Sequence, residues 1–471
     1  MKHHAGRAVK NLTLGSCLLA GPALAEAPPP NIVFMLADDQ AWSGLSVPMH
    51  PTLPGGFNAA YHTPHAARLS SEGTRFSQAY APAPVCAPTR AALVTGRSPA
   101  SLGWTRAGPS LRAADNPPLL PGANARQLDD EYVTFAERLT DAGYATAHFG
   151  KWHLAGGGPE AHGFAVSDGD LGNETAAQFT DPNPVDLFGM ATRAEDFMQA
   201  ARDDGRPFYV QLSWHALHAP QNARAATLAK YENAGLRGRA AARAALTEDL
   251  DEALGRVLDA VDRLGLADNT YVIYTSDNGG TAPRRRDADT ALRGGKGTLY
   301  EGGLRVPLIV RGPGVAADAW CDVPTVGTDW YPTFLDWAGL KPDRETADAL
   351  VGGSLTPLLA GRASSVDRPR DALLFHFPHY QTDDGPHSAV VHGRHKLIRF
   401  DVADRVELYD LSADPGERDD LAAEEPRLAR RLTRLLDAEL DDLDAHRVAP
   451  NPDYDADEPV NLRRPRGASR R

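Results

Sequence analysis

Predominantly apolar runs recur along the first part of the chain, beginning with residues 31–37. Runs of this kind are typical of strands that are buried on both faces of a parallel sheet. Strands are therefore predicted at residues 31–37, 144–149, 208–212, 270–274 and 306–310.

Segments with helical periodicity lie between these runs. Thr63-Pro64 opens a short helix that Gly73 closes, and further helices are predicted at residues 134–141, 239–264 and 330–337. The alternation of strands with helices predicts a layered α/β domain with a mainly parallel central sheet, spanning residues 31–365.

The pattern changes after a polar, proline-containing stretch from Gly361 to Asp371. A charged helix at residues 424–443 follows short, closely spaced strands, which are predicted at residues 372–377, 388–392, 396–401 and 406–411. We expect a small C-terminal α+β domain with an antiparallel sheet over residues 366–446. The final residues, 447–471, are rich in Pro, Asp and Arg and are predicted to form a loose tail.

The N-terminus has the pattern of an export signal. Basic residues precede a short apolar run from Leu12 to Ala20, and Ala23-Leu24-Ala25 fits a cleavage site. This run is too short to span a bilayer, and no later segment is predicted to do so. We therefore expect a signal peptide over residues 1–25 and export to the periplasm or the medium. Lipid anchoring through Cys17 is the alternative.

Composition narrows the possible partners. The chain has 471 residues and a net charge of −13, which argues against a nucleic-acid binder. An anionic small substrate stays compatible, because the local field of a pocket can oppose the net charge. If the signal is removed, Cys86 and Cys321 remain. These two cysteines could form a disulfide. Alternatively, Cys86 is catalytic and Cys321 is unpaired.

Oxygen donors follow two of the predicted strands. Asp38 and Asp39 come directly after residues 31–37, and Asp277 and Asn278 follow the strand at 270–274. Binding sites form at the carboxyl ends of such strands in open α/β sheets. Hard oxygen ligands suit Ca²⁺ or Mg²⁺, so a divalent metal site is predicted there.

A further candidate is the stretch from Cys86 to Arg97, which begins Cys86-Ala87-Pro88-Thr89-Arg90 and ends in Thr95-Gly96-Arg97. It is predicted as a loop that runs into a helix, where the helix dipole favours an anion. Taken alone, it could be a buried cysteine beside a structural arginine. The whole stretch, however, resembles the signature of the type I, formylglycine-dependent sulfatases of the alkaline phosphatase-like superfamily. Thr89 stands where that family more often has Ser.

The resemblance continues in order along the chain from Asn31 to Ala422. Leu217 stands where the family often has Pro, which makes nearby His215 a rival to His218. The matching segments are Gly150-Lys151-Trp152-His153-Leu154, His218-Ala219-Pro220, Gly294-Gly295-Lys296-Gly297, Glu301-Gly302-Gly303 and residues 328–333, 354–359, 407–411 and 414–417.

The resemblance implies a set of roles. A maturing enzyme would oxidise Cys86 to formylglycine, whose hydrate is a geminal diol: one hydroxyl attacks sulfur, and the other then loses its proton so that sulfate leaves. Calcium, or alternatively magnesium, would be held by Asp38, Asp39, Asp277, Asn278 and the modified Cys86. Arg90 would steady the diol, Lys151 and Lys296 would contact the sulfuryl oxygens, His153 would handle the diol proton, and His218 would protonate the leaving alcohol.

The favoured hypothesis is an exported sulfatase acting on a sulfated saccharide. The alternatives are a phosphonate monoester or phosphodiester hydrolase of the same superfamily, and an inactive glycan-binding relative. His376 and His379 lie in a stretch that resembles one in polysaccharide-acting sulfatases, and Arg284, Arg285 and Arg286 lie in a loop expected at the pocket mouth. Together with His215, these are the predicted substrate contacts. The alternatives for them are interface packing and a solvated loop.

Overall fold

A computed structural model describes residues 1–2, 28–108, 116–281, 291–458 and 460. The predicted signal peptide, Cys17 and Arg284 to Arg286 lie outside these residues. Among the described residues, no helix combines the length and the apolar character that a membrane span needs.

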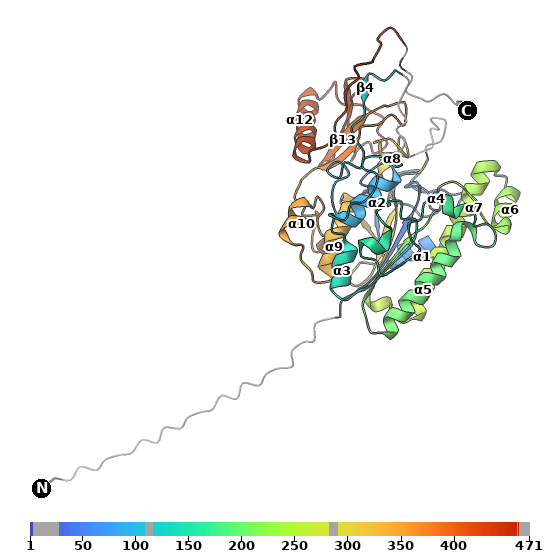
Figure 1. Ribbon diagram of the computed structural model, residues 1–471. Coiled ribbons are helices and arrows are strands. Elements are labelled where there is room, and N and C mark those ends of the chain that lie inside the picture. The colour runs from blue at the N-terminus through green and yellow to red at the C-terminus, as the bar shows by residue number, and fades with distance from the viewer. Residues whose placement is uncertain (3–27, 109–115, 282–290, 459, 461–471) are drawn as a thin grey trace.

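The large domain is built on an eight-stranded sheet (Figure 1). In spatial order its strands are β10 (Ala319–Cys321), β2 (Thr74–Phe76), β9 (Leu308–Arg311), β8 (Thr270–Ser276), β1 (Asn31–Ala37), β7 (Phe208–Ser213), β5 (Ala145–Gly150) and β6 (Val166–Ser167). The strands from β8 to β6 run parallel, which confirms the mainly parallel sheet. The run at 306–310 contributes β9, which is antiparallel to both β8 and β2.

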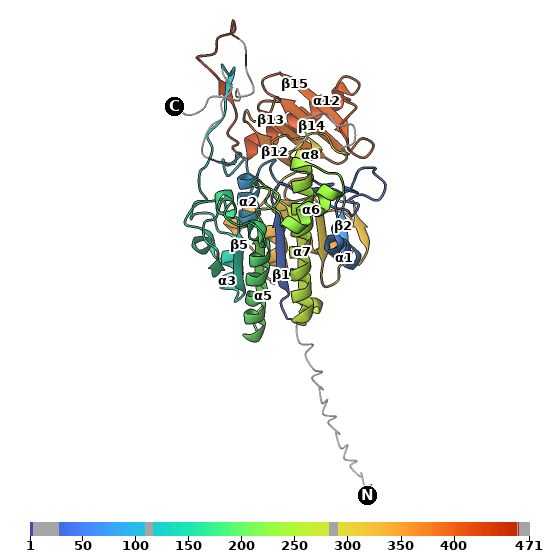
Figure 2. The ribbon, with the colours of Figure 1, turned by 90° about the vertical axis from the view of Figure 1, so that its right-hand side faces the viewer.

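Helices cover both faces of this sheet (Figure 2). One face packs against α1 (Pro64–Glu72), α5 (Leu187–Asp203) and α7 (Gly238–Arg263), and the other against α2 (Cys86–Thr95), α3 (Phe135–Asp141) and α9 (Trp330–Trp337). Shorter elements of the large domain include β3 (Ala79–Tyr80), α4 (Asn173–Ala176), α6 (Ala225–Asn233), α8 (Glu301–Leu304), β11 (Thr325–Val326), α10 (Arg344–Ala349) and α11 (Thr356–Leu359).

The C-terminal residues form a separate four-stranded antiparallel sheet, as predicted. Its strands are β12 (Leu373–Phe377), β13 (His387–His392), β14 (His395–Phe400) and β15 (Arg405–Asp410). The helix α12 (Pro426–Asp442) covers one face through Leu432, Leu436 and Leu440. The other face packs on the large domain, where side chains such as Tyr80 and Leu304 join its core. This sheet lies beyond the carboxyl ends of the parallel strands (Figure 2).

The segment after residue 446 differs at its start from the predicted loose tail. Residues Ala449–Pro450 form β16, which pairs antiparallel with β4 (Leu119–Leu120). Asn451 extends the contact, because its backbone N–H donates to Pro118 O at 3.0 Å. The partner strand is distant in sequence, so local composition gives no sign of this pairing.

Candidate active site

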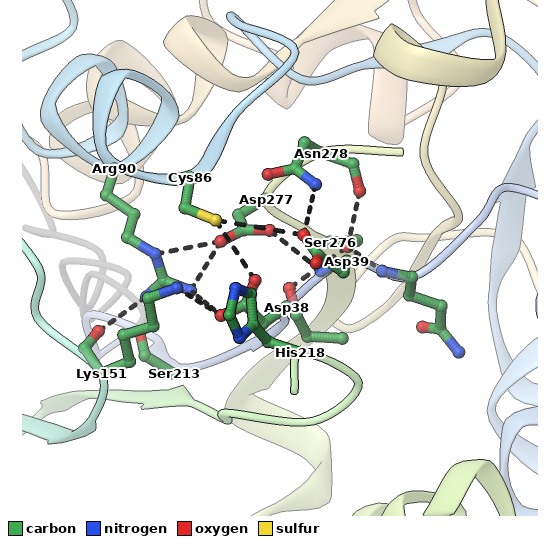
Figure 3. Close-up of polar contacts among 12 residues, drawn as sticks. Asp38, Asp39, Cys86, Arg90, Lys151, Ser213, His218, Ser276, Asp277 and Asn278 are labelled. Carbon is green, nitrogen blue, oxygen red and sulfur yellow. Dashed lines mark hydrogen bonds and ion pairs between the residues drawn. The ribbon is translucent and has the colours of Figure 1, made fainter. Parts of the chain in front are cut away.

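Most of the predicted core site residues follow the carboxyl ends of four neighbouring parallel strands, and they lie together at one edge of the sheet (Figure 3). Asp38 and Asp39 follow β1, and Asp277 and Asn278 follow β8. The remaining residues are Lys151 and His153 after β5, His215 and His218 after β7, Lys296 before α8, and Cys86 and Arg90 on α2. The structure therefore brings together the core residues that the sequence analysis named.

Cys86 is the first residue of α2 and is buried. Val85 before it is extended, and Gly96 ends the helix in a left-handed conformation with φ of 67°. The Cys86 thiol donates to Asp38 Oδ1 at 3.3 Å, and Lys296 Nζ lies 3.2 Å from Sγ. The side chain at position 86 therefore points into the carboxylate cluster, away from solvent.

Four side chains could share one metal ion. One ligand atom from each of Asp38, Asp39, Cys86 and Asp277 lies within 4.8 Å of the others, and all four residues are buried. Asn278 adjoins them, with Nδ2 donating to Asp39 Oδ1 at 2.8 Å, while its Oδ1 is buried without a protein partner. Buried acceptors are normally satisfied, and a cation would satisfy this one. The oxygen donors of Asp38, Asp39, Asp277 and Asn278 therefore fit a hard divalent cation such as Ca²⁺.

Three cationic side chains surround the three carboxylates. Arg90 contacts Asp277 Oδ2 through Nη2 at 2.8 Å and Nε at 3.1 Å, and its Nη1 donates to Lys151 O at 2.6 Å. Lys151 is fully buried and pairs with Asp38 Oδ2, and Lys296 Nζ lies 2.6 Å from Asp39 Oδ1. The formal charges of these six side chains cancel, so a bound divalent cation would leave the site positive and suited to an anionic substrate.

Burial and charge act in opposite directions on these groups. Burial alone would raise the pKa of Asp38, but Lys151, Lys296 and Arg90 hold it well below its usual range. The pKa of Asp277 is raised, because burial and the neighbouring Asp38 outweigh Arg90. Burial also raises the pKa of the Cys86 thiol, with Asp277 and Asp38 adding to the effect. The unmodified thiol is therefore kept protonated at neutral pH.

Three histidines border the cluster. Burial, followed by the charge of Lys151, lowers the pKa of His153 and of His215 to about 3, so both rings are neutral at pH 7. Each has a buried Nδ1 without a protein partner. His218 is only half-buried, and its Nδ1 lies 2.7 Å from Ala219 O. Figure 3 shows its ring beside Asp38, and it is the more exposed of the two histidines that follow β7.

The predicted saccharide contacts in the C-terminal domain are buried. Both ring nitrogens of His376 have partners, Ser388 Oγ at 2.8 Å and His446 O at 3.1 Å. The Nε2 atom of His379 lies 2.8 Å from Thr105 Oγ1. These contacts agree with the alternative of interface packing, and a saccharide contact stays a prediction.

Two neighbours of the site were not found from the sequence. Ser276 Oγ accepts from Gln40 N at 3.0 Å and so ties the ends of β8 and β1 together. Its position directly before Asp277 was an available signal. Arg243 on α7 donates to the Asp39 backbone oxygen at 2.6 Å. It lies in an Ala- and Arg-rich helix, where no local pattern distinguishes it. Cys321 is free, so the possible disulfide with Cys86 is absent.

Comparison with protein-family models gives two matches. Residues 30–340 match the model described as Sulfatase. Residues 295–446 match the model described as N-sulphoglucosamine sulphohydrolase, C-terminal.

Several curated proteins are similar over most of their length. Human arylsulfatase A is 33% identical, over 90% of this chain and 91% of its own. A sulfatase of Formosa agariphila is 31% identical, over 84% of this chain and 85% of its own. The N-acetylgalactosamine-6-sulfatase of Rattus norvegicus is 31% identical, over 72% of this chain and 67% of its own.

Solved structures share the fold. One is Ps i-CgsB in complex with k-i-k-neocarrahexaose, with a TM-score of 0.71 and 22% identity over 88% of this chain and 93% of that one. Another is BT4656 in complex with its substrate D-glucosamine-2-N,6-O-disulfate, with a TM-score of 0.65 and 23% identity over 91% of this chain and 100% of that one.

Proposed function

The chain belongs to the sulfatase family, whose members hydrolyse sulfate esters, and we propose that its substrate is a sulfated saccharide. The nucleophile would be a formylglycine made from Cys86. The divalent metal would be calcium or, alternatively, magnesium. The observation that carries the proposal is the buried cluster of Asp38, Asp39, Cys86 and Asp277. It supports the proposal because the Cys86 side chain lies among carboxylates that suit a hard divalent cation, with Lys151 and Lys296 beside them.

Each group of the site would have a separate role in the reaction. Hydrated formylglycine would supply the attacking hydroxyl and a second hydroxyl from which sulfate is expelled. A metal held by Asp38, Asp39, Asp277 and Asn278 would supply positive charge. Lys151 and Lys296 would contact the sulfuryl oxygens, whose negative charge redistributes in the transition state. Arg90, which contacts Asp277 and Lys151 O, would orient the side chain at position 86.

The histidines would move protons. Neutral His153 can accept a proton from the side chain at position 86, because its low pKa leaves the ring uncharged. His218 would give a proton to the leaving alcohol, since a sugar alkoxide is a poor leaving group. Its half-buried position is consistent with contact to the substrate.

A saccharide substrate is supported by the curated relatives. One is named for N-acetylgalactosamine 6-sulfate, and the C-terminal residues match a model named for N-sulphoglucosamine. We propose export to the periplasm or the medium on the basis of the N-terminal pattern. A formylglycine-generating enzyme would then be an obligatory partner.

Mass spectrometry of the tryptic peptide that contains Cys86 tests the nucleophile. Protein made together with a maturing enzyme should show the mass loss of thiol-to-aldehyde conversion, and Cys86→Ala should remove turnover while keeping the melting temperature near that of the wild type. Full activity in Cys86→Ala would overturn the proposal.

A substrate panel tests the specificity. We expect hydrolysis of aryl sulfates and of at least one defined sulfated mono- or oligosaccharide, with much slower turnover of aryl phosphate diesters and phosphonate monoesters. Faster turnover of the phosphorus esters would favour the alternative hydrolase. Binding of saccharides without turnover by converted protein would favour the inactive relative.

A further inference from the structure

Lys296 is carried by a loop that lies between the two domains. This Lys296 loop, residues 293–304, ends in α8, which sits directly beneath the C-terminal sheet (Figure 2). Lys296 Nζ reaches Asp39 Oδ1 at 2.6 Å and Cys86 Sγ at 3.2 Å. The position of this ammonium therefore depends on whatever holds the loop.

Strands of the C-terminal domain hold the loop by hydrogen bonds on both sides of Lys296. The backbone N–H of Leu299 donates to His387 Nε2 at 3.0 Å. The Tyr300 hydroxyl donates to Glu407 Oε2 at 2.8 Å, and Arg293 Nη1 donates to Tyr409 OH at 2.8 Å. These partners lie on β13 and β15, in the other domain.

A buried charged cluster fixes the end of the same loop. Lys396 on β14 is fully buried, and its Nζ lies 2.8 Å from Glu301 Oε1 and 2.8 Å from Glu417 Oε1. Glu417 Oε2 accepts from the Glu301 backbone N–H at 2.6 Å, and Arg305 Nε donates to Glu301 Oε2 at 2.7 Å. Charges removed from water are tolerated only in good mutual geometry, so this cluster gives the loop one preferred position.

The backbone at Glu417 supports a specific role for its side chain. Its φ is 53°, in the left-handed region that glycine or asparagine adopts at lower cost. The carboxylate nonetheless occupies this position and bonds to the first turn of α8. The strained residue is thus part of the contact that holds the Lys296 loop.

We infer that Lys396 and Glu417 are positioning residues for Lys296: the C-terminal domain takes part in catalysis by holding the loop that brings this ammonium to the site. The inference rests on the proposed function only for the role of Lys296 toward sulfate. It does not require that the C-terminal domain contact a saccharide.

A double-mutant cycle, with aryl sulfate hydrolysis as the assay, tests whether Lys396 and Glu417 act through Lys296. Lys396→Met combined with Glu417→Gln removes one charge of each sign, and the amide that Glu417→Gln introduces would keep an acceptor for the Glu301 N–H. We expect kcat to fall about 10- to 100-fold, as for displacement of a catalytic group by about 1 Å. In a Lys296→Ala background the same pair of changes should cost almost nothing more, because their effect acts through Lys296.

Arg368→Met is the matched control. Arg368 forms an ion pair at 2.7 Å with buried Asp329, and its other hydrogen-bond partner is Pro324 O, so within the described part of the chain neither of its polar partners belongs to the Lys296 loop. If Arg368→Met lowers kcat, it should do so by the same factor in the wild-type and the Lys296→Ala backgrounds. If the Lys396/Glu417 variant does not fold, Glu417→Gln alone should give a smaller loss with the same dependence on Lys296. Equal losses in both backgrounds would overturn the inference.

Amine labelling gives a readout that needs no turnover. Acylation of Lys296, followed by mass spectrometry of its peptide, should become faster in the Lys396/Glu417 variant and stay at the wild-type rate in Arg368→Met. Unchanged labelling would overturn the positioning role. Faster labelling in a protein whose converted wild type hydrolyses no sulfate ester would support the positioning and contradict the proposed function instead.

Discussion

Three carboxylates in one buried pocket repel one another, and Arg90, Lys151 and Lys296 offset that repulsion. The buried, unpartnered Oδ1 of Asn278 adds an acceptor on the same side. At the scale of residues, the site is therefore arranged to receive a further positive charge, and loss of a metal should affect both turnover and stability.

Metal removal is the first prediction. Dialysis against EGTA should abolish sulfate ester hydrolysis and lower the melting temperature, since a ligand at about 100 times its Kd stabilises the native state by about 2.7 kcal/mol. Calcium should restore both quantities, and magnesium less completely. An unchanged rate after thorough chelation would show that the metal assignment is wrong.

His218→Ala should discriminate between leaving groups. General-acid assistance is worth about 10²–10⁴-fold, and activated phenols need little of it. We therefore expect a large fall in kcat on sulfated sugars and a small one on nitrophenyl sulfate, with His215→Ala as the comparison. Equal losses on both substrates would contradict the general-acid role of His218 and favour His215.

At the scale of elements, the end of α2 is set by a close approach. Gly96 has φ of 67°, and a Cβ there would overlap Leu350 Cδ2 and lie 2.9 Å from Tyr331 Cβ. The helix that carries Cys86 and Arg90 can end at this point only without a side chain.

Gly96→Ala should destabilise the protein by more than the backbone cost of holding an alanine in the left-handed conformation. We expect about 1–2 kcal/mol from the backbone conformation and about 1–3 kcal/mol more from overpacking. Gly314→Ala is the matched control, because φ is 75° there and a Cβ would meet nothing within 4 Å. Urea unfolding of both variants separates the two costs, and equal destabilisation would contradict the packing argument.

Asp251 on α7 holds the start of α1. Its carboxylate accepts from His65 N at 2.9 Å and Ala66 N at 2.8 Å, and burial raises its pKa from 3.8 to about 7. Since the folded state binds this proton more tightly than the unfolded state, the contribution of Asp251 to the free energy of unfolding should fall as pH rises from about 4 to 7 and level off above.

Asp251→Asn should remove that contribution to the pH dependence. The difference in unfolding free energy between wild type and variant should change by at most about 4 kcal/mol between pH 4 and pH 8, in favour of the variant at high pH. Denaturant unfolding at several pH values measures it. Parallel pH profiles for the two proteins would show that Asp251 does not titrate in this range.

At the scale of the whole molecule, the two domains share a core. Apolar side chains of β12 to β15 pack with Tyr80, Leu299 and Tyr300 of the large domain, and Lys396 pairs with Glu301 across the same boundary. The predicted limits at residues 365 and 366 separate two sheets, yet the chain should unfold as one cooperative unit.

Truncation tests that cooperativity. A chain that ends at residue 365 should be insoluble or molten, because it exposes the shared core and leaves Glu301 without Lys396. A chain that ends at residue 448 loses only the β4–β16 pairing and nearby contacts, and should keep its melting temperature within a few degrees. Thermal scans with circular dichroism measure both, and a stable, folded 365-residue chain would contradict the shared core.

The fold class and the residues of the core site could be predicted from the sequence. Predominantly apolar runs predicted β1, β5, β7 and β8, and the ends of these strands contribute Asp38, Lys151, His218 and Asp277, because residues that follow parallel strands meet at one edge. The stretch around Cys86 supplied the reaction type through its resemblance to a family. Each of these signals is local, so it can be read from a short segment.

Features that join distant segments could not be predicted from the sequence and are seen in the folded chain alone. The antiparallel direction of β9, the β4–β16 pairing, the contact of Arg243 with Asp39 O and the cluster of Lys396, Glu301 and Glu417 each join residues far apart in the chain. The sequence also gave no sign that His215 is buried and His218 half-buried, because a histidine next to the same strand end can face either the core or the solvent. Such contacts arise from packing, which no local pattern encodes.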